Sequence, residues 1–182
     1  MTSPRPRRIL TISGSLRARS SNTEALRAVA LLAPEDVEVV PFVGLDTLPH
    51  FNPDLDEEGA VLPAAVRALR DAVASADGLL ICSPEYAHGV PGSLKNALDW
   101  LVSGPEMPNK PVGLLNVSSR STYAQASLAE TLRTMSTLVV PDATITIALD
   151  GRRLDAEGIA EIPEFASSIQ SALRALIAAL PG

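Results

Sequence analysis

The chain has 182 residues, of which 46% are hydrophobic and 20% are charged, and its formal net charge is −6. This composition predicts one globular domain over residues 1–182, and the acidic balance argues against a general nucleic-acid-binding protein, which ordinarily carries a basic face. The single cysteine, Cys82, rules out an internal disulfide framework and a cysteine-cluster metal site.

The N-terminal segment is short and basic. We expect residues 1–6 to be disordered. No long apolar segment follows before the polar residues 13–15, so a signal peptide is not predicted. No stretch is long enough to span a bilayer. We therefore expect a cytoplasmic protein without a membrane partner.

Short apolar runs alternate with longer helical patterns along the chain. The predicted strands are residues 9–12, 37–40, 78–82, 112–117 and 143–148, and the last alternates as an edge strand does. The predicted helices are residues 22–33, 62–75, 91–103, 122–138 and 163–180. Trp100 lies off the apolar stripe of the third helix, where it would cover a neighbouring surface.

The alternation of strands and helices predicts an α/β fold. Units of this kind give a parallel sheet with helices on both faces, and five strands fit the doubly wound order 2-1-3-4-5. In that order a ligand binds at the carboxyl ends of the first and third strands.

The loop after the first strand, GSLRARSSN at residues 14–22, is rich in hydroxyls and ends at a helix start. Exposed N–H groups and the positive end of a helix favour an anion, and Arg17 adds a directed donor. The loop matches neither the Walker A nor the G-x-G-x-x-G pattern, which leaves a site for a single phosphate. The alternative is a capping box formed by Ser21 and Glu24.

The loop after the third strand combines Pro84, Glu85 and Tyr86 with two glycines, and it precedes a helix that begins near Pro91. Its backbone can approach a flat ligand closely, and Tyr86 can cover one face of that ligand. Alternatively, the loop is a structural turn in which Tyr86 packs on the domain. For His88 a solvated loop position is the simpler interpretation, and Cys82 is expected to be a buried packing residue.

The loop after the fourth strand, NVSSRSTY at residues 116–123, is also polar. Ser118 and its neighbours are placed to border the far edge of a ring ligand. The alternative is a helix cap formed by Ser121 or Thr122.

Taken together, these loops resemble the NADPH-dependent FMN reductase family, which has a flavodoxin-like fold. The resemblance lies in GSLRARSSN (14–22), LPHFNPDL (48–55), SPEY (83–86) and PGSLKNALDW (91–100). Two departures stand out. Ala87 replaces a frequent asparagine, and residues 118–123 lack the Gly-Gly pair of many members.

The resemblance implies a flavodoxin-like three-layer sandwich and a bound FMN. The residues implied to contact the FMN phosphate are Ser15, Arg17, Ser20 and Asn22, and those implied along the ring are Pro84, Glu85, Tyr86, Ala87 and Ser118. It implies hydride transfer from NAD(P)H to the flavin N5, followed by two-electron reduction of a quinone, a flavin or a similar acceptor in a ping-pong cycle. No catalytic side chain and no metal ligand is assigned.

The resemblance further implies a homodimer or homotetramer, with Trp100 and the 42–61 segment as interface elements. Two other functions remain open at this point. A flavodoxin-type electron carrier would bind FMN without using NAD(P)H, and a flavin-free binding module would retain only the fold.

Overall fold

The computed structural model describes residues 5–57 and 59–181. The first four residues of the segment predicted to be disordered lie outside this range. Arg5, which lies inside it, forms an ion pair with Asp77 at 2.6 Å. In the described part of the chain no helix is both long and apolar enough to cross a membrane.

The five strands form one parallel sheet in the order β2-β1-β3-β4-β5, as predicted. They span β1 (Arg7–Ser13), β2 (Val37–Pro41), β3 (Gly78–Cys82), β4 (Pro111–Asn116) and β5 (Leu138–Thr146). β3 and β4 are buried throughout, as central strands covered on both faces should be.

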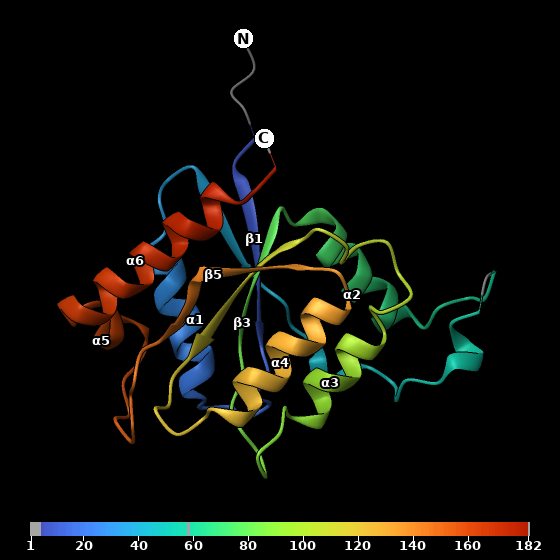
Figure 1. The fold of residues 1–182 in the computed structure, drawn as a ribbon, viewed down its shortest axis with the longest axis horizontal. Helices are drawn as coiled ribbons and strands as arrows, with labels where there is room; N and C mark the ends of the chain where they lie inside the picture. The colour runs from blue at the N-terminus through green and yellow to red at the C-terminus, as the bar shows by residue number, and fades with distance from the viewer. Residues whose placement is uncertain (1–4, 58, 182) are drawn as a thin grey trace.

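Helices cover both faces of the sheet (Figure 1). One face carries α1 (Ser21–Leu31), α5 (Ala156–Ala160) and α6 (Pro163–Ala178), and the other carries α2 (Ala64–Ser75), α3 (Gly92–Asp99) and α4 (Tyr123–Thr134). Alternate strand residues feed the two cores, because Ile9 packs with the first set and Leu10 with the second. The predicted three-layer α/β sandwich is confirmed.

Two boundaries around α4 differ from the prediction. The helix ends at Thr134 rather than near residue 138, and β5 begins at Leu138 rather than at residue 143. Ser136 has a φ of 60°, and Thr137 N donates back to Leu132 O. This left-handed turn is the usual end of a helix, but glycine usually occupies it. Without a glycine, the sequence carries no stop signal there.

The short helix α5 was not predicted. Its first turn is capped by Asp155, whose side chain accepts a hydrogen bond from Gly158 N at 2.9 Å. A five-residue helix is too short to show a hydrophobic period, so its formation depends on this cap and on the contacts of Ile159 with the core.

Trp100 does cover a neighbouring surface, but that surface belongs to its own chain. The side chain is fully buried, its Nε1 donates to Pro49 O at 2.8 Å, and its ring meets Phe51 edge to face at 5.0 Å. The expectation that Trp100 lies in a subunit interface is therefore wrong. Its role is to fix the segment between β2 and α2.

A second anchor holds the same segment. Arg70 on α2 pairs with Asp56 at 2.8 Å and donates from Nε to Trp100 O at 3.0 Å. Ser103 also donates to Asp56. The long connection is therefore tied to α2 and to the end of α3, beside the carboxyl edge of the sheet.

Candidate functional site

Three loops that follow β1, β3 and β4 meet at the carboxyl edge of the sheet, along the lower side of Figure 1. They enclose an open hollow of about 280 Å³. Eight of the nine predicted cofactor-binding residues line it, namely Ser15, Arg17, Ser20, Asn22, Pro84, Glu85, Tyr86 and Ser118. Residues from three separate parts of the sequence thus converge where the doubly wound order predicts a ligand.

The loop after β1 is organised by its own hydroxyls. Ser13 Oγ lies 2.9 Å from Thr23 Oγ1, and Arg17 N donates to Ser15 Oγ at 3.3 Å. The N-cap of α1 is Ser20 and makes no side-chain capping bond, while Glu24 pairs with Arg27 at 2.7 Å. The capping box considered for Ser21 and Glu24 is therefore not formed.

Ser20 is the most informative residue of this loop. Its hydroxyl is buried and has no hydrogen-bond partner among the described residues, although it lines the hollow at the N-terminus of α1. Buried hydroxyls nearly always have a partner. An anion held by the first turn of α1 would supply an acceptor, so the loop fits a phosphate group.

The side chain of Asn22 is held in place by the buried thiol of Cys82. Burial raises the pKa of the Cys82 thiol well above its usual range, because a thiolate would lose its hydration in the apolar interior. The protonated thiol donates to Asn22 Oδ1 at 3.2 Å. Cys82 is thus the buried packing residue that was expected, and it also orients one side chain of the site.

The loops after β1 and β3 touch directly. Gly14 N donates to Cys82 O at 2.8 Å. A Cβ atom on Gly14 would lie 2.8 Å from Ser83 Oγ and 3.0 Å from Leu94, closer than packed atoms allow. Only glycine lets these two halves of the site approach so closely.

Tyr86 begins a tight hairpin at the mouth of the hollow. It exchanges two backbone hydrogen bonds with Gly89, of 3.0 and 2.9 Å, and its side chain is 56% exposed. Tyr86 therefore does not pack into the domain, and its ring is available to a ligand. Ala87, the ninth predicted residue, lies in the turn but not in the lining of the hollow, so its contact with a cofactor stays a prediction.

The two central residues of this hairpin have left-handed backbones, with φ of 49° at Ala87 and 60° at His88. Left-handed φ costs an L-residue other than glycine or asparagine about 1–2 kcal/mol. The asparagine that the resemblance led us to expect at position 87 would suit such a turn better than alanine.

We expect Ala87→Gly to raise the free energy of unfolding by about 1 kcal/mol, because glycine removes the clash at positive φ. The matched control is Ala74→Gly on the exposed side of helix α2, which should lower it by about the same amount. Urea denaturation of both variants measures the two changes. A loss of stability in both would contradict the assignment of strain to Ala87.

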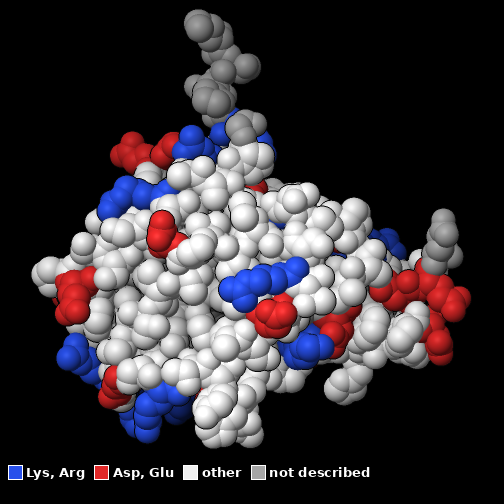
Figure 2. Space-filling view, viewed as in Figure 1, with Lys and Arg blue, Asp and Glu red and all other residues white. Residues whose placement is uncertain are grey.

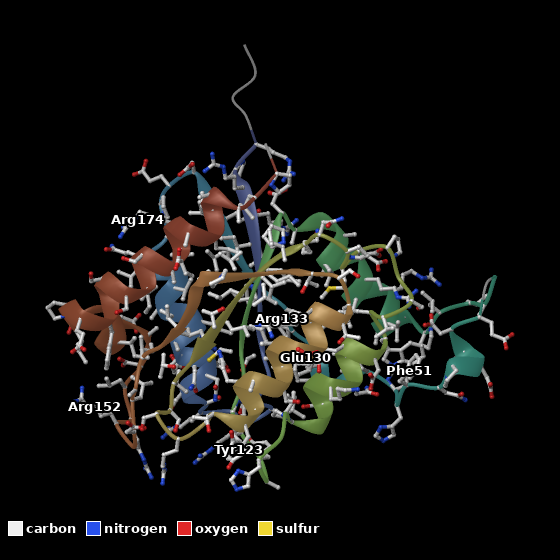
Figure 3. All side chains as sticks on the ribbon, viewed as in Figure 1. Phe51, Tyr123, Glu130, Arg133, Arg152 and Arg174 are labelled. Carbon is white, nitrogen blue, oxygen red and sulfur yellow. The ribbon has the colours of Figure 1, made fainter. Side chains whose placement is uncertain are left out.

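Glu85 connects the loop after β3 to the start of α4. Its Oε2 accepts a hydrogen bond from Ala124 N at 2.9 Å, and its Oε1 lies 3.4 Å from His88 Nδ1. The His88 ring in turn meets Tyr123 edge to face at 4.4 Å; Tyr123 is labelled in Figure 3. His88 was expected to be a solvated residue, and it is exposed, but it also completes this bridge between two loops.

The loop after β4 is ordered by Asn116, which sequence reasoning passed over. Its Nδ2 donates to Ser118 O at 2.8 Å and to Ser121 O at 3.2 Å. Arg120 N donates to Ser118 Oγ at 3.3 Å. Thr122 is the N-cap of α4 without a side-chain cap bond, so the alternative of a hydroxyl cap at Thr122 is not realised.

Several further residues of the hollow were not predicted. They are Arg19, Ser21, Ser83, Asn116, Val117, Ser121, Leu149, Asp150 and Gly151, whereas Arg120 is one of the neighbours of Ser118 that were expected there. Residues 149–151 come from the C-terminal part of the sequence, where no site residue was predicted. Ser119 N donates to Asp150 Oδ1 at 3.1 Å, which brings this segment to the site. No motif marks it.

Comparisons with known proteins agree with this geometry. The sequence pattern of the family described as "NADPH-dependent FMN reductase" matches residues 7–151. A quinone reductase of Escherichia coli K12 is 37% identical over 139 residues, which cover 75% of this chain and 72% of that protein. An NAD(P)H-dependent FMN reductase of Pseudomonas aeruginosa is 32% identical over 174 residues, covering 93% and 92%.

Among solved structures, the NAD(P)H:(acceptor) oxidoreductase FerB from Paracoccus denitrificans superimposes with a TM-score of 0.73 at 22% identity. The match covers 96% of this chain and 100% of that one. At this identity the likeness concerns the fold.

Proposed function

Because this chain belongs to the NADPH-dependent FMN reductase family, it is an oxidoreductase that uses FMN and NAD(P)H, and we propose that it reduces a quinone or a similar two-electron acceptor in a ping-pong cycle. The observation that carries this proposal is the hollow at the carboxyl edge. One of its loops has a buried hydroxyl at a helix N-terminus that no described residue partners, and a second loop offers an exposed aromatic wall.

The phosphate of FMN would bind to the loop after β1. Ser15 and Ser20 supply hydroxyls, Arg17 supplies a charged donor, and Asn22 is held beside them by Cys82. The N-terminus of α1 adds the positive end of a helix dipole. Such a site holds an anion by local groups against the net charge of −6.

The flavin ring would lie between the loops after β3 and β4. Pro84 and Tyr86 line one side and Ser118 the other. The Glu85 carboxylate is engaged with Ala124 N, so this residue would act on the ring through its backbone and by holding the two loops together. FMN, when bound, supplies the two-electron redox chemistry.

NAD(P)H and the acceptor would use the same open side of the hollow in turn, beside Tyr86. Overall, NAD(P)H, a quinone and one proton give NAD(P)⁺ and a hydroquinone, so one of the two protons that the quinone gains comes from solvent. The mouth of the hollow is exposed at Tyr86 and His88. This exposure supports access of solvent and of two substrates that alternate. The E. coli relative named a quinone reductase supports the choice of acceptor.

The visible spectrum of the purified protein, reconstituted with FMN and kept anaerobic, tests the proposal. We expect a bound flavin spectrum that bleaches when NADPH or NADH is added and returns when a benzoquinone is added. Parallel lines in double-reciprocal plots against both substrates would establish the ping-pong order. A bound flavin that stays oxidised with both nucleotides would contradict the proposal and identify an electron carrier.

We also propose a homodimer or a larger homo-oligomer, acting in the reducing cytoplasm, where an unpaired cysteine such as Cys82 persists. Two large exposed apolar side chains of the 42–61 segment, Leu55 and Val61, support an interface there. Sedimentation velocity at micromolar concentration checks it, and a monomer would contradict it.

A further inference from the structure

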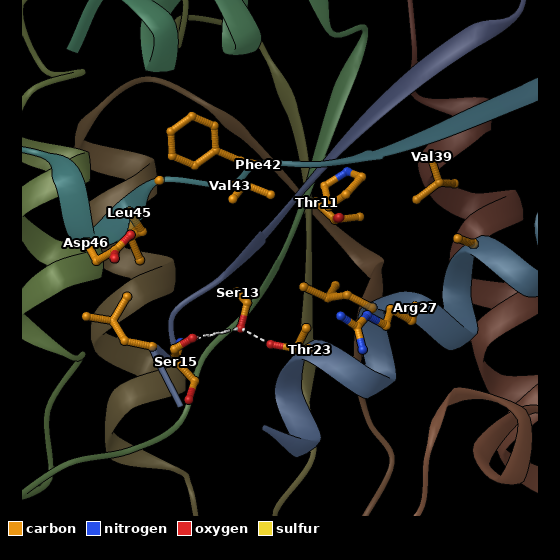
Figure 4. A pocket seen from close by; sticks show the side chains of 15 residues that line it. Thr11, Ser13, Ser15, Thr23, Arg27, Val39, Phe42, Val43, Leu45 and Asp46 are labelled. Atoms are coloured by element: carbon orange, nitrogen blue, oxygen red, sulfur yellow. Dashed lines mark hydrogen bonds between the residues drawn. The ribbon is translucent and has the colours of Figure 1, made fainter. Parts of the chain in front are cut away.

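A second hollow lies on the α1 side of the sheet, between α1, the ends of β1 and β2, and the segment that follows β2 (Figure 4). Its volume is about 330 Å³. Its walls are mostly apolar and include Leu26 and Ala30 from α1, Val39 from β2, and Phe42 and Leu45 from the following segment. Concave apolar sites of this size are typical of small-molecule pockets.

A few polar groups face this apolar space. Ser13 Oγ and Thr23 Oγ1 lie 2.9 Å apart (Figure 4), and the buried Thr11 also contributes to the lining. Hydroxyls both donate and accept, so they can meet the ring nitrogens and the amino group of a heteroaromatic ring. The mouth bears two exposed apolar side chains, Leu16 and Val43, which are 56% and 85% exposed.

The second hollow adjoins the flavin site. Ser15 lines both hollows, and the loop that carries it separates them. Arg17 and Arg19 lie on the flavin side of this loop, and neither pairs with a carboxylate in the part of the chain that the structure describes. Because Arg17 is assigned to the FMN phosphate, a molecule that crosses the loop from one hollow to the other would pass beside the guanidinium group of Arg19.

We propose that the second hollow binds the adenosine end of NAD(P)H. This inference rests on the proposed function, because the nicotinamide end must reach the flavin hollow. A dinucleotide has a ring at each end and a pyrophosphate between them. The structure offers groups in the same order: an open aromatic site at Tyr86, the guanidinium group of Arg19 on the intervening loop, and an apolar pocket with hydroxyls.

The sequence gives the adenosine no other recognised place, because the chain has no G-x-G-x-x-G motif. Arg27 at the edge of the pocket is paired with Glu24 and Arg17 is assigned to FMN, so the charge available to the pyrophosphate comes from Arg19. Leu16, exposed at the crest of the loop, would be covered by the bound nucleotide.

The test is a variant in which a larger side chain fills the pocket. Ala30 lines it from an exposed position on α1, so Ala30→Phe occupies the space without disturbing the core. The matched control is Leu31→Phe, next to it on the same helix, exposed and outside the pocket lining. The probe is ADP-ribose, which keeps the adenosine and pyrophosphate but carries no nicotinamide.

We expect ADP-ribose to bind the wild-type protein and Leu31→Phe equally in calorimetric titrations, and to bind Ala30→Phe at least tenfold more weakly. With FMN bound, the KM for NADPH should rise by the same factor in Ala30→Phe while kcat at saturation and the affinity for FMN stay unchanged.

Absence of ADP-ribose binding to the wild-type protein would overturn the inference, as would equal binding to all three proteins. Failure of the proposed function gives a different result, since the wild-type flavin would then not bleach with either nucleotide. Pocket-dependent binding of ADP-ribose in a protein that does not bleach would uphold the adenosine site and reject the reductase.

Discussion

An Arg17→Ala variant is expected to bind FMN about 10- to 100-fold more weakly than the wild-type protein, because a hydrogen bond to a charged group contributes about 1.5–3 kcal/mol. Arg17 lines the flavin hollow, and its guanidinium is the charged donor that the proposed phosphate site contains. Quenching of FMN fluorescence on titration with apoprotein gives the dissociation constant.

Two further variants serve as controls for this result. Arg17→Lys keeps the charge but loses the planar donor geometry. Its affinity for FMN should therefore fall between those of the wild-type protein and Arg17→Ala. Arg174→Ala, on α6 away from the site (Figure 3), should bind FMN normally. An unchanged affinity of Arg17→Ala for FMN would contradict the assignment of the phosphate to this loop.

Ser20 gives the same assignment an independent check. Because its buried hydroxyl lacks a hydrogen-bond partner in the part of the chain that the structure describes, Ser20→Ala should raise the stability of the FMN-free protein by about 1 kcal/mol. It should also weaken FMN binding, since the phosphate loses that hydroxyl. An anion site predicts these opposite signs, whereas a purely structural serine would shift only stability.

The Arg70→Met variant is expected to lose about 3–5 kcal/mol of folding free energy, the cost of removing one partner from a buried ion pair. The side chains of Arg70 and Asp56 are 14% and 6% exposed. Without Arg70, the Asp56 carboxylate keeps, among the described residues, only the hydroxyl of Ser103 as a side-chain donor, and Trp100 O loses the guanidinium as its donor. Urea denaturation of the FMN-free protein measures the loss.

Arg67→Met is the matched control, because Arg67 lies one turn earlier on α2 and is exposed. It should change stability by less than about 0.5 kcal/mol. The double variant Asp56→Asn/Arg70→Met should recover part of the loss, since no unpaired charge then remains. Equal stability of Arg70→Met and Arg67→Met would show that the pair contributes nothing to the anchoring of the 42–61 segment.

The family resemblance of the loops was confirmed because each motif is a short, continuous stretch of sequence. GSLRARSSN and SPEY each follow a buried apolar run, and parallel strands deliver their following loops to one edge. Sequence alone was less informative where a side chain acts at long range. Glu85 was expected along the flavin ring, yet its carboxylate binds the start of α4, 39 residues further on.

The order of the five strands, the parallel sheet and the position of the hollow at its carboxyl edge followed from the sequence by itself, because the 2.0 and 3.6 residue periods and the loop chemistry are properties of neighbouring residues. The tertiary structure decided what depends on contacts between distant segments. These contacts bury Trp100 against Pro49 and Phe51, bring residues 149–151 to the hollow and leave the Ser20 hydroxyl without a hydrogen-bond partner among the described residues. Such features arise from packing around two cores, which no short stretch of sequence encodes.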